Sequence, residues 1–333
     1  MRNVFRINAS IKEQEFSDEI FKHMPIHGNE EVSLLKGYDL QDFIVLTDDF
    51  SFPLRHNIGA SSKNTIGLEL ECEYADYFSI DKEMIKGWSI VGDASLTEGI
   101  EINSPILRDT KKNWEELRCV CDTLSKYAKE GKHAAGHIHI GKQAYSDNKS
   151  ALVRFMYFWI RYEHIILRFT NGEFLCDRPE MSYYAKPITD LLIDILNRHS
   201  KFEYRYSDLI HDLSYERYQA VNFQNYNSLK TIEFRCPNIS FNPVIWQNNV
   251  NLFLKILKYV SSDEFDIDSA KKIIEERKKG VVINYNKVYI EDALNFADIV
   301  FDNNLDKVYF FKQYLKSFEE SRRYVKAKTF SKS

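Results

Sequence analysis

Short stretches of alternating apolar and polar residues predict four β-strands, at residues 65–73, 99–105, 136–141 and 231–235. Successive side chains of a strand point to opposite faces, so each stretch has one apolar face and one polar face. A further stretch, 217–223, also fits a strand. Several strands that each carry one apolar face imply a sheet covered by helices on one side.

Runs with apolar residues at intervals of three and four predict long helices between these strands. The first covers 114–128 and is expected to end at Gly131. The second covers about 150–169, with either Ser150 or Asn148 as its cap. Apolar residues surround this second helix almost completely, which predicts a buried, central position.

The rest of the chain divides around this pattern. Pro243 suits the first turn of a third helix, and the region after residue 261 is expected to be helical, with the charge run 271–279 on a solvated face. The sequence therefore predicts an irregular extension over 1–64, a central domain of strands and helices over 65–260 and a helical extension over 261–333.

The polar faces of the four strands carry almost only side chains that can bind a cation or a phosphate. Surface faces without a function usually mix in Thr, Lys and Ser. Carboxylates two positions apart on a strand lie about 6.5–7 Å apart, which is repulsive but suitable for bracketing a cation. In strand order, the polar positions are Glu69, Glu71 and Glu73, then Glu101 and Asn103, then His137 and His139, then Glu233 and Arg235.

Carboxylates that converge on one face cannot all stay ionised without compensation, and a divalent cation supplies it. A set dominated by carboxylates favours Mg²⁺ or Mn²⁺, while the histidines would also admit zinc. A zinc site would more often include cysteine, and Cys72 is expected to face the core. Asp93 follows a glycine, so it is either a turn residue or one more carboxylate of the same site.

Three further polar residues suit contacts with phosphate or carboxylate groups. Arg217 and Asn222 lie in the stretch 217–223, and Arg178 precedes an aromatic segment that ends at 183–186. Each of them alone is more typical of a surface or structural role. A functional role for these three residues is indicated only by the cation- and phosphate-binding side chains on the polar strand faces.

Composition and absent motifs narrow the class of protein. With 45 Lys and Arg against 49 Asp and Glu, the net charge of −4 argues against a general nucleic-acid binder. We find no stretch long enough for a membrane span and no signal-peptide pattern, and five cysteines without a CxxC pair favour a reducing cytoplasm. The Walker A, GxGxxG, HExxH and GxSxG motifs are absent, so any nucleotide would be held by cations and arginines.

Taken in order, these motifs resemble those of the putative amidoligase family, particularly its phage-type members. That family is related to the carboxylate–amine ligases typified by gamma-glutamylcysteine ligase and, more remotely, by glutamine synthetase. The resemblance covers about residues 65–259. It rests on Gly-Leu-Glu-Leu-Glu at 67–71, Gly-Asp-Ala-Ser at 92–95, Gly-Ile-Glu-Ile-Asn-Ser-Pro at 99–105, Gly-His-Ile-His-Ile at 136–140, Arg217-Tyr218 with Asn222, and Thr-Ile-Glu-Phe-Arg at 231–235.

The resemblance implies an α+β fold whose curved, mainly antiparallel sheet is backed by helices and holds ATP with two or three Mg²⁺ (or Mn²⁺) ions on its concave face. Arg235 would contact the transferred phosphate, with Arg217 as a second catalytic arginine beside Glu233, and Arg178 and Asn222 would complete the nucleotide contacts. The implied metal ligands are Glu69, Glu71, Glu101, His137 and Glu233, with Asp93 and His139 as further candidates.

The implied reaction is ATP-dependent formation of an amide through an acyl phosphate, on an amino acid, a peptide or a related small substrate. It would take place in the cytoplasm of a bacterium or of a phage-infected host, without nucleic-acid or membrane partners. Two alternatives remain open: a metal-dependent hydrolase that uses the same Glu/His cluster to activate water, and a non-catalytic module that binds cations. The sequence identifies neither the carboxylate nor the amine, and it leaves the oligomeric state open.

Overall fold

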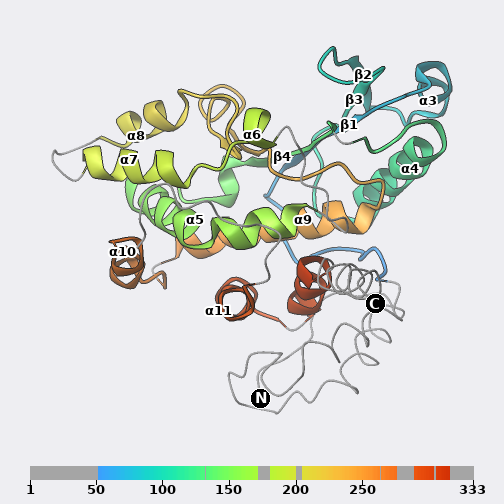
Figure 1. Cartoon of the computed structure of the whole chain (residues 1–333). Helices are drawn as coiled ribbons and strands as arrows, with labels where there is room; N and C mark the ends of the chain where they lie inside the picture. The colour runs from blue at the N-terminus through green and yellow to red at the C-terminus, as the bar shows by residue number, and fades with distance from the viewer. Residues whose placement is uncertain are drawn as a thin grey trace, which may run out of the picture.

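The computed structural model describes residues 52–131, 133–171, 181–199, 205–262, 264–275, 289–303 and 305–315. These residues contain an open six-stranded sheet in the order β2-β3-β1-β4-β6-β5, with every neighbouring pair antiparallel (Figure 1). The prediction of an α+β fold with an antiparallel sheet backed by helices is confirmed. The strands are β1 (Ile66–Cys72), β2 (Ser89–Gly92), β3 (Ile100–Asn103), β4 (Gly136–Gly141), β5 (Val221–Asn222) and β6 (Thr231–Phe234).

The four main strands lie where the alternation predicts them. In β1 the apolar positions Ile66, Leu68, Leu70 and Cys72 are at most 1% exposed. The stretch 217–223 differs, because only its residues 221 and 222 join the sheet. The carbonyl of Ala220 still accepts a hydrogen bond from the backbone N–H of Arg235, but Tyr218 and the N–H of Ala220 are hydrogen-bonded to Lys186 instead, so the pairing with β6 does not extend further.

The three long helices are α4 (Lys111–Tyr127), α5 (Lys149–Thr170) and α9 (Pro243–Ser261). The side chain of Asn148 accepts a hydrogen bond from the backbone of α5, which settles the cap in favour of Asn148 rather than Ser150. Helix α4 ends before Gly131, which lies beyond it with a positive φ of 56°.

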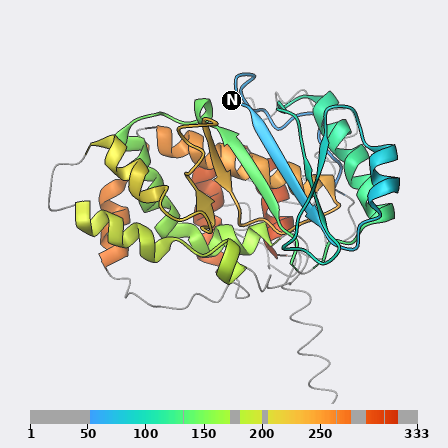
Figure 2. The same cartoon turned by 90° about the horizontal axis from the view of Figure 1, so that it is seen from above.

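Helices α5 and α9 form the layer beneath the sheet, and the strands cross above them in Figure 2. The contact is close at Gly136 of β4, where a Cβ atom would lie 2.6 Å from the Trp246 ring of α9. Phe234 of β6 stacks on Phe253 of α9 with ring centroids 3.9 Å apart. This packing buries the apolar face of the sheet against the helices, and its polar face is turned away from them.

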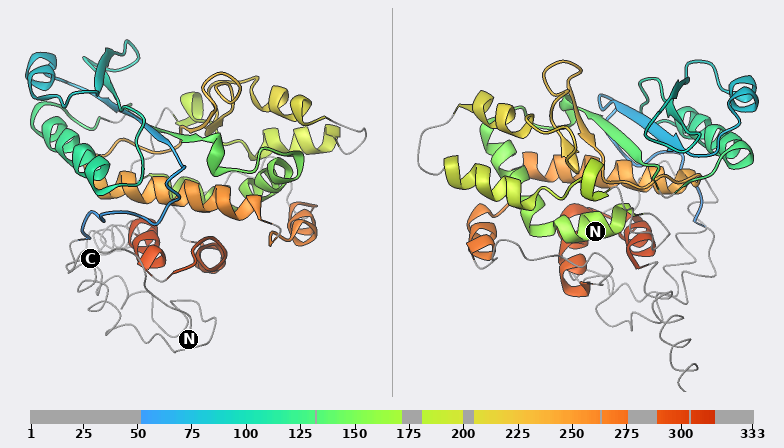
Figure 3. Two further views of the ribbon diagram at one scale, coloured as in Figure 1. Left: turned by 180° about the vertical axis from the view of Figure 1, so that it is seen from behind. Right: turned by 45° about the horizontal axis from the view of Figure 1, so that its top comes forward.

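The remaining elements surround this two-layer centre. Seen from behind, α10 and α11 lie on the side of α5 and α9 that faces away from the sheet (Figure 3). Residues 305–315 are also helical, and none of the described helices is long and apolar enough to span a membrane. The predicted domain boundaries stay predictions, and of the charge run 271–279 only 271–275 is described. The shorter elements are α3 (Tyr77–Glu83), η1 (Lys142–Ala144), α6 (Met181–Tyr184), α7 (Thr189–His199), α8 (Tyr206–Leu213), α10 (Ile267–Glu275) and α11 (Ile290–Val300).

A buried ion pair joins the segment before β1 to the helical segment 305–315. Arg55 Nη1 lies 2.6 Å from Asp306 Oδ1, and both side chains are 1% exposed. The guanidinium also lies over the ring of Tyr309, and Asn251 of α9 donates a second hydrogen bond to Asp306. Segments separated by 251 residues are therefore held together against α9.

Removing one member of this pair should be strongly destabilising. We expect Arg55→Met to lower the free energy of unfolding by about 3 kcal/mol, because the carboxylate of Asp306 stays buried with only Lys255, 3.4 Å away, as a cationic partner. Urea denaturation measures the change. The control is Arg118→Met, since the ion pairs of Arg118 with Glu115 and Asp122 are half exposed and should be worth less than about 1 kcal/mol. Equal losses in the two variants would contradict the prediction.

Candidate active site

A pocket of about 260 Å³ opens on the polar face of the sheet. It brings together seven of the residues selected from the sequence: Glu69, Glu71, Asp93, Glu101, His137, Arg217 and Arg235. Four carboxylates and two guanidinium groups thus line one small space. The other lining residues are Ser95, His133, Ala135, Tyr184 and Tyr218.

Strand register explains why these side chains converge. Residues directly opposite each other in neighbouring strands point to the same face. The pairing sets Glu69 of β1 opposite His137 of β4, and Glu71 of β1 opposite Glu101 of β3. On the other side of β4, Glu233 of β6 lies opposite His139. Four short strands therefore place their polar side chains in adjacent rows.

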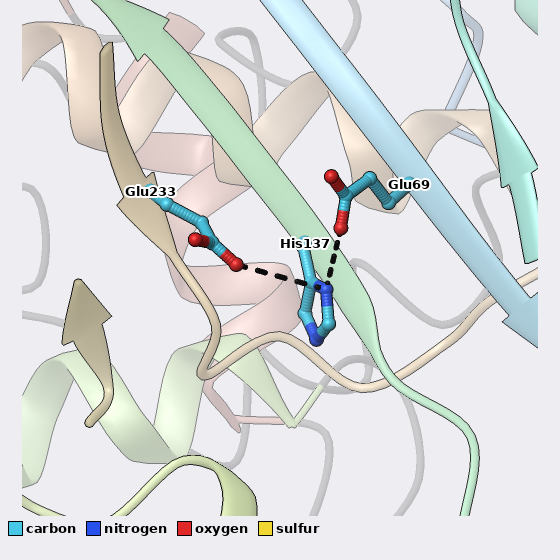
Figure 4. A group of neighbouring side chains, drawn as sticks. All are labelled: Glu69, His137 and Glu233. Carbon is cyan, nitrogen blue, oxygen red and sulfur yellow. Dashed lines mark hydrogen bonds and ion pairs between the residues drawn. The ribbon is translucent and has the colours of Figure 1, made fainter. Parts of the chain in front are cut away.

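His137 lies at the centre of this arrangement and is 3% exposed. Its Nδ1 is 2.8 Å from Glu69 Oε2 and 3.9 Å from Glu233 Oε1, the two contacts drawn in Figure 4. Its Nε2 is 3.4 Å from Glu71 Oε1. Both ring nitrogens thus face carboxylate oxygens that come from two other strands.

Two groups of side chains in this cluster have the spacing of metal ligands. Glu69, His137 and Glu233 offer three ligand atoms within 4.8 Å of one another, and Glu71, Glu101 and His137 offer a second such set. Carboxylate oxygens with one imidazole suit Mg²⁺ or Mn²⁺, and the described residues that line the pocket include no cysteine. The donor chemistry therefore fits a pair of divalent cations, with His137 belonging to both sets.

Comparison with known proteins decides the family. Residues 54–257, more than half of the chain, match the family described as putative amidoligase enzymes. The chain belongs to this amidoligase family. Among curated proteins no relative matches it. Membership supports an enzyme of the ligase class that forms amide bonds, and the matched residues include all six strands and the whole described lining of the pocket.

Three ionisable side chains of this amidoligase site, Glu69, His139 and Glu101, have shifted pKa values, and the shifts differ in direction. Burial alone would raise the pKa of Glu69, but hydrogen bonds from His137 and His139 outweigh it and hold that pKa far below its usual range. Burial would lower the pKa of His139, yet its hydrogen bond to Glu69 raises it. The pKa of Glu101 is raised by burial and by the charge of Glu69. A cation bound beside Glu101 would favour the ionised form of this carboxyl group.

A second layer of hydrogen bonds fixes the orientation of the cluster. Glu233 accepts hydrogen bonds from Arg235 Nη1 and from Asn222 Nδ2, and Glu71 accepts one from the backbone N–H of Ala135 at 2.7 Å. Asn222 is 1% exposed, so in this structure it holds Glu233 and does not line the pocket. Its predicted nucleotide contact stays a prediction.

The other candidates occupy different positions. His139 lies behind Glu69, with its Nε2 2.9 Å from Glu69 Oε1, and belongs to neither ligand set. Asp93 lines the pocket and also acts as a turn residue, because its Oδ1 accepts hydrogen bonds from both N–H and O–H of Ser95. Glu73 is directed away and accepts a hydrogen bond from Thr97 N. Arg178 lies outside the described residues.

Sequence reasoning missed His133, Tyr184 and Tyr218 as pocket residues. Two of them had a local signal: His133 lies four residues before His137, and Tyr218 follows Arg217 directly. Tyr184 had none, because its place depends on contacts with β6. The Nε of Arg235 donates a hydrogen bond to the carbonyl of Tyr184, 3.1 Å away.

Proposed function

We propose that this chain is an ATP-dependent carboxylate–amine ligase that works through an acyl phosphate. Family membership supports amide-bond formation. The observation that carries the finer proposal is the pair of cation-ligand sets that share His137. All their members except Glu233, which is hydrogen-bonded to Arg235, line one pocket together with Arg235. A nucleoside triphosphate is a substrate that suits a site with both cation ligands and an arginine, because divalent cations and arginine together neutralise the charge of its phosphates.

In this proposal, Glu69, Glu71, Glu101, Glu233 and His137 hold Mg²⁺ or Mn²⁺. The bound ions supply charge neutralisation for the phosphoryl groups. Carboxylates dominate both sets, which is the ligand chemistry that these hard ions prefer.

Arg235 is the residue best placed to stabilise the transferred phosphoryl group. It is 6% exposed, and its Nη1 and Nε are fixed by Glu233 and by the carbonyl of Tyr184. A donor that is already oriented needs no rearrangement when charge develops in the transition state. Arg217, which is exposed at the pocket, provides a second contact to nucleotide or carboxylate.

The reaction proceeds in two displacements. An oxygen of the substrate carboxylate attacks the γ-phosphorus of ATP, and the bond to the bridging oxygen breaks to release ADP. The amine nitrogen then attacks the acyl carbon, phosphate leaves with that carboxylate oxygen, and the amine loses a proton. Neither step needs a nucleophile from the protein. The described lining of the pocket contains no cysteine or lysine, and the hydroxyl of its Ser95 donates a hydrogen bond to Asp93.

An acyl phosphate can be trapped, which tests the proposal directly. With ATP, Mg²⁺ and pooled carboxylates but no amine, added hydroxylamine should yield a hydroxamate that mass spectrometry identifies. A carboxylate labelled with ¹⁸O should transfer one labelled oxygen to the released phosphate. Glu69→Gln, which removes a proposed metal ligand, should abolish both signals while the protein still melts cooperatively.

The hydrolase and the cation-binding module give different results in this experiment. If the protein with Mg²⁺ cleaves amides or phosphoesters in the absence of ATP, the ligase proposal is wrong and the protein is a hydrolase. Cation binding without any turnover of ATP, across the full carboxylate and amine pools, would favour the non-catalytic module.

A further inference from the structure

Two partly exposed tyrosines form one wall at the mouth of the pocket. Tyr184 is 41% exposed and Tyr218 is 42% exposed, and both line the pocket. Their rings meet edge to face, with centroids 5.2 Å apart and an interplanar angle of 79°. Aromatic surface left open beside a polar pocket is typical of a place where a ligand packs a flat, apolar group.

The backbone holds this tyrosine pair in position before any ligand binds. The carbonyl of Tyr184 accepts a hydrogen bond from Arg235, and the carbonyl of Tyr218 accepts one from the N–H of Lys186, 3.0 Å away. Lys186 and Gln219 also form a parallel bridge. The segment that follows α6 and the segment that leads into β5 are thereby tied together, so stacking on the pair would require little ordering of the chain.

Charge around the tyrosine pair shows which part of a ligand belongs there. The guanidinium of Arg217 lies 5.8 Å from the ring centroid of Tyr218, and Arg235 is hydrogen-bonded to Tyr184 on one side and to Glu233, a member of a cation-ligand set, on the other. Arg235 thus connects the backbone that carries Tyr184 to the acidic cluster, and Arg217 adds a second positive charge beside Tyr218. A ligand with a flat ring at one end and a chain of negative charge at the other matches this order.

We propose that Tyr184 and Tyr218 form the stacking surface for the base of ATP. This inference rests on the proposed function, which places the triphosphate among the arginines and the cations. Stacking on aromatic side chains accepts any base, because every base has a π face. The competing ligand for the same wall is an aromatic group of the carboxylate substrate, and the experiment separates the two.

The test compares the binding of ATP with that of inorganic tripolyphosphate, which has the charge but no base. Isothermal titration in Mg²⁺ should show that Tyr184→Ala and Tyr218→Ala each weaken ATP binding by about 5- to 150-fold, the effect of losing one stacked ring. Tripolyphosphate binding should not change, and Tyr184→Phe should retain most of the affinity for ATP. Tyr183→Ala is the matched control, since Tyr183 is 69% exposed in the same helix and does not line the pocket.

Several outcomes would overturn this inference. Unchanged ATP affinity in both alanine variants would mean that the base does not stack on these tyrosines. An equal loss of affinity for ATP and for tripolyphosphate would mean the same. If the alanine variants raise the KM for the carboxylate substrate and leave ATP affinity unchanged, the two tyrosines bind that substrate instead of the base. In each of these cases the ligase proposal would stand. If the unmodified protein binds neither ATP nor tripolyphosphate, the ligase proposal and the stacking inference fail together.

Discussion

We expect His137→Ala to lower ATP-dependent amide formation by about a thousand-fold. His137 is the one residue that belongs to both cation-ligand sets, so its loss weakens both proposed metal positions at once. A bound metal ion is worth several kcal/mol of transition-state stabilisation, and each 1.36 kcal/mol corresponds to a factor of ten in rate. Steady-state rates at saturating ATP measure the effect, and titration with Mg²⁺ should show weaker binding.

His139→Ala is the matched control, because His139 lies on the same strand and the same face. It belongs to neither ligand set and acts by fixing Glu69, 2.9 Å away. Residues that orient a metal ligand without touching the metal typically cost ten- to a hundred-fold when removed. The two variants should therefore be separated by at least about one order of magnitude. Equal losses of activity in the two variants would mean that His137 is not a ligand of the metal.

The second large effect is expected for Arg235→Lys. Lysine keeps the charge but loses the planar guanidinium, which can donate to two phosphate oxygens at once while it holds Glu233 and the carbonyl of Tyr184. We expect turnover to fall by about ten- to a thousand-fold, the range for removal of an oriented donor that stabilises developing charge. The rate of ADP release with ATP, Mg²⁺ and both substrates measures the loss.

Arg217→Lys provides the comparison within the pocket. Arg217 is exposed, and among the described residues no hydrogen bond or ion pair orients its guanidinium, which only approaches the ring of Tyr218, so the same substitution should cost less there. Thermal melting should show that both variants fold. If Arg235→Lys keeps full activity and Arg217→Lys does not, the phosphate contact belongs to Arg217.

Much of the fold could be predicted from local pattern. Alternation placed Glu69 and Glu71 on one face of a strand because side-chain direction depends only on the extended backbone. It could not predict that Glu69 lies opposite His137, since register is set by contacts between strands that are distant in sequence. The same reasoning failed for Glu73 at the end of β1, where a bridge to Lys129 replaces the pairing with β4.

Other parts of the site depend on tertiary contacts that leave no periodic signal. Tyr184 reaches the pocket through a hydrogen bond to Arg235, a residue 51 positions away. Tyr218 lies there because the backbone at 218–220 pairs with Lys186, and this pairing also explains why the predicted strand over 217–223 shrinks to β5. The candidate cation ligands can thus be recognised from the strand pattern of the sequence, whereas Tyr184 and Tyr218 can be placed at the pocket only from the folded backbone.

The ion pair between Arg55 and Asp306 has a consequence for the order in which a growing chain can fold. Arg55 leaves the ribosome 251 residues ahead of its partner, which at about 5–20 residues per second is a delay of about 13 to 50 s. Strand β1 also waits for β4 before its central position in the sheet is filled. That wait is shorter, because Gly136 follows Ile66 by 70 residues, about 4 to 14 s at the same rate. The ion pair can therefore form only after all six strands have been synthesised, so it stabilises the finished fold and cannot guide the first steps of its assembly.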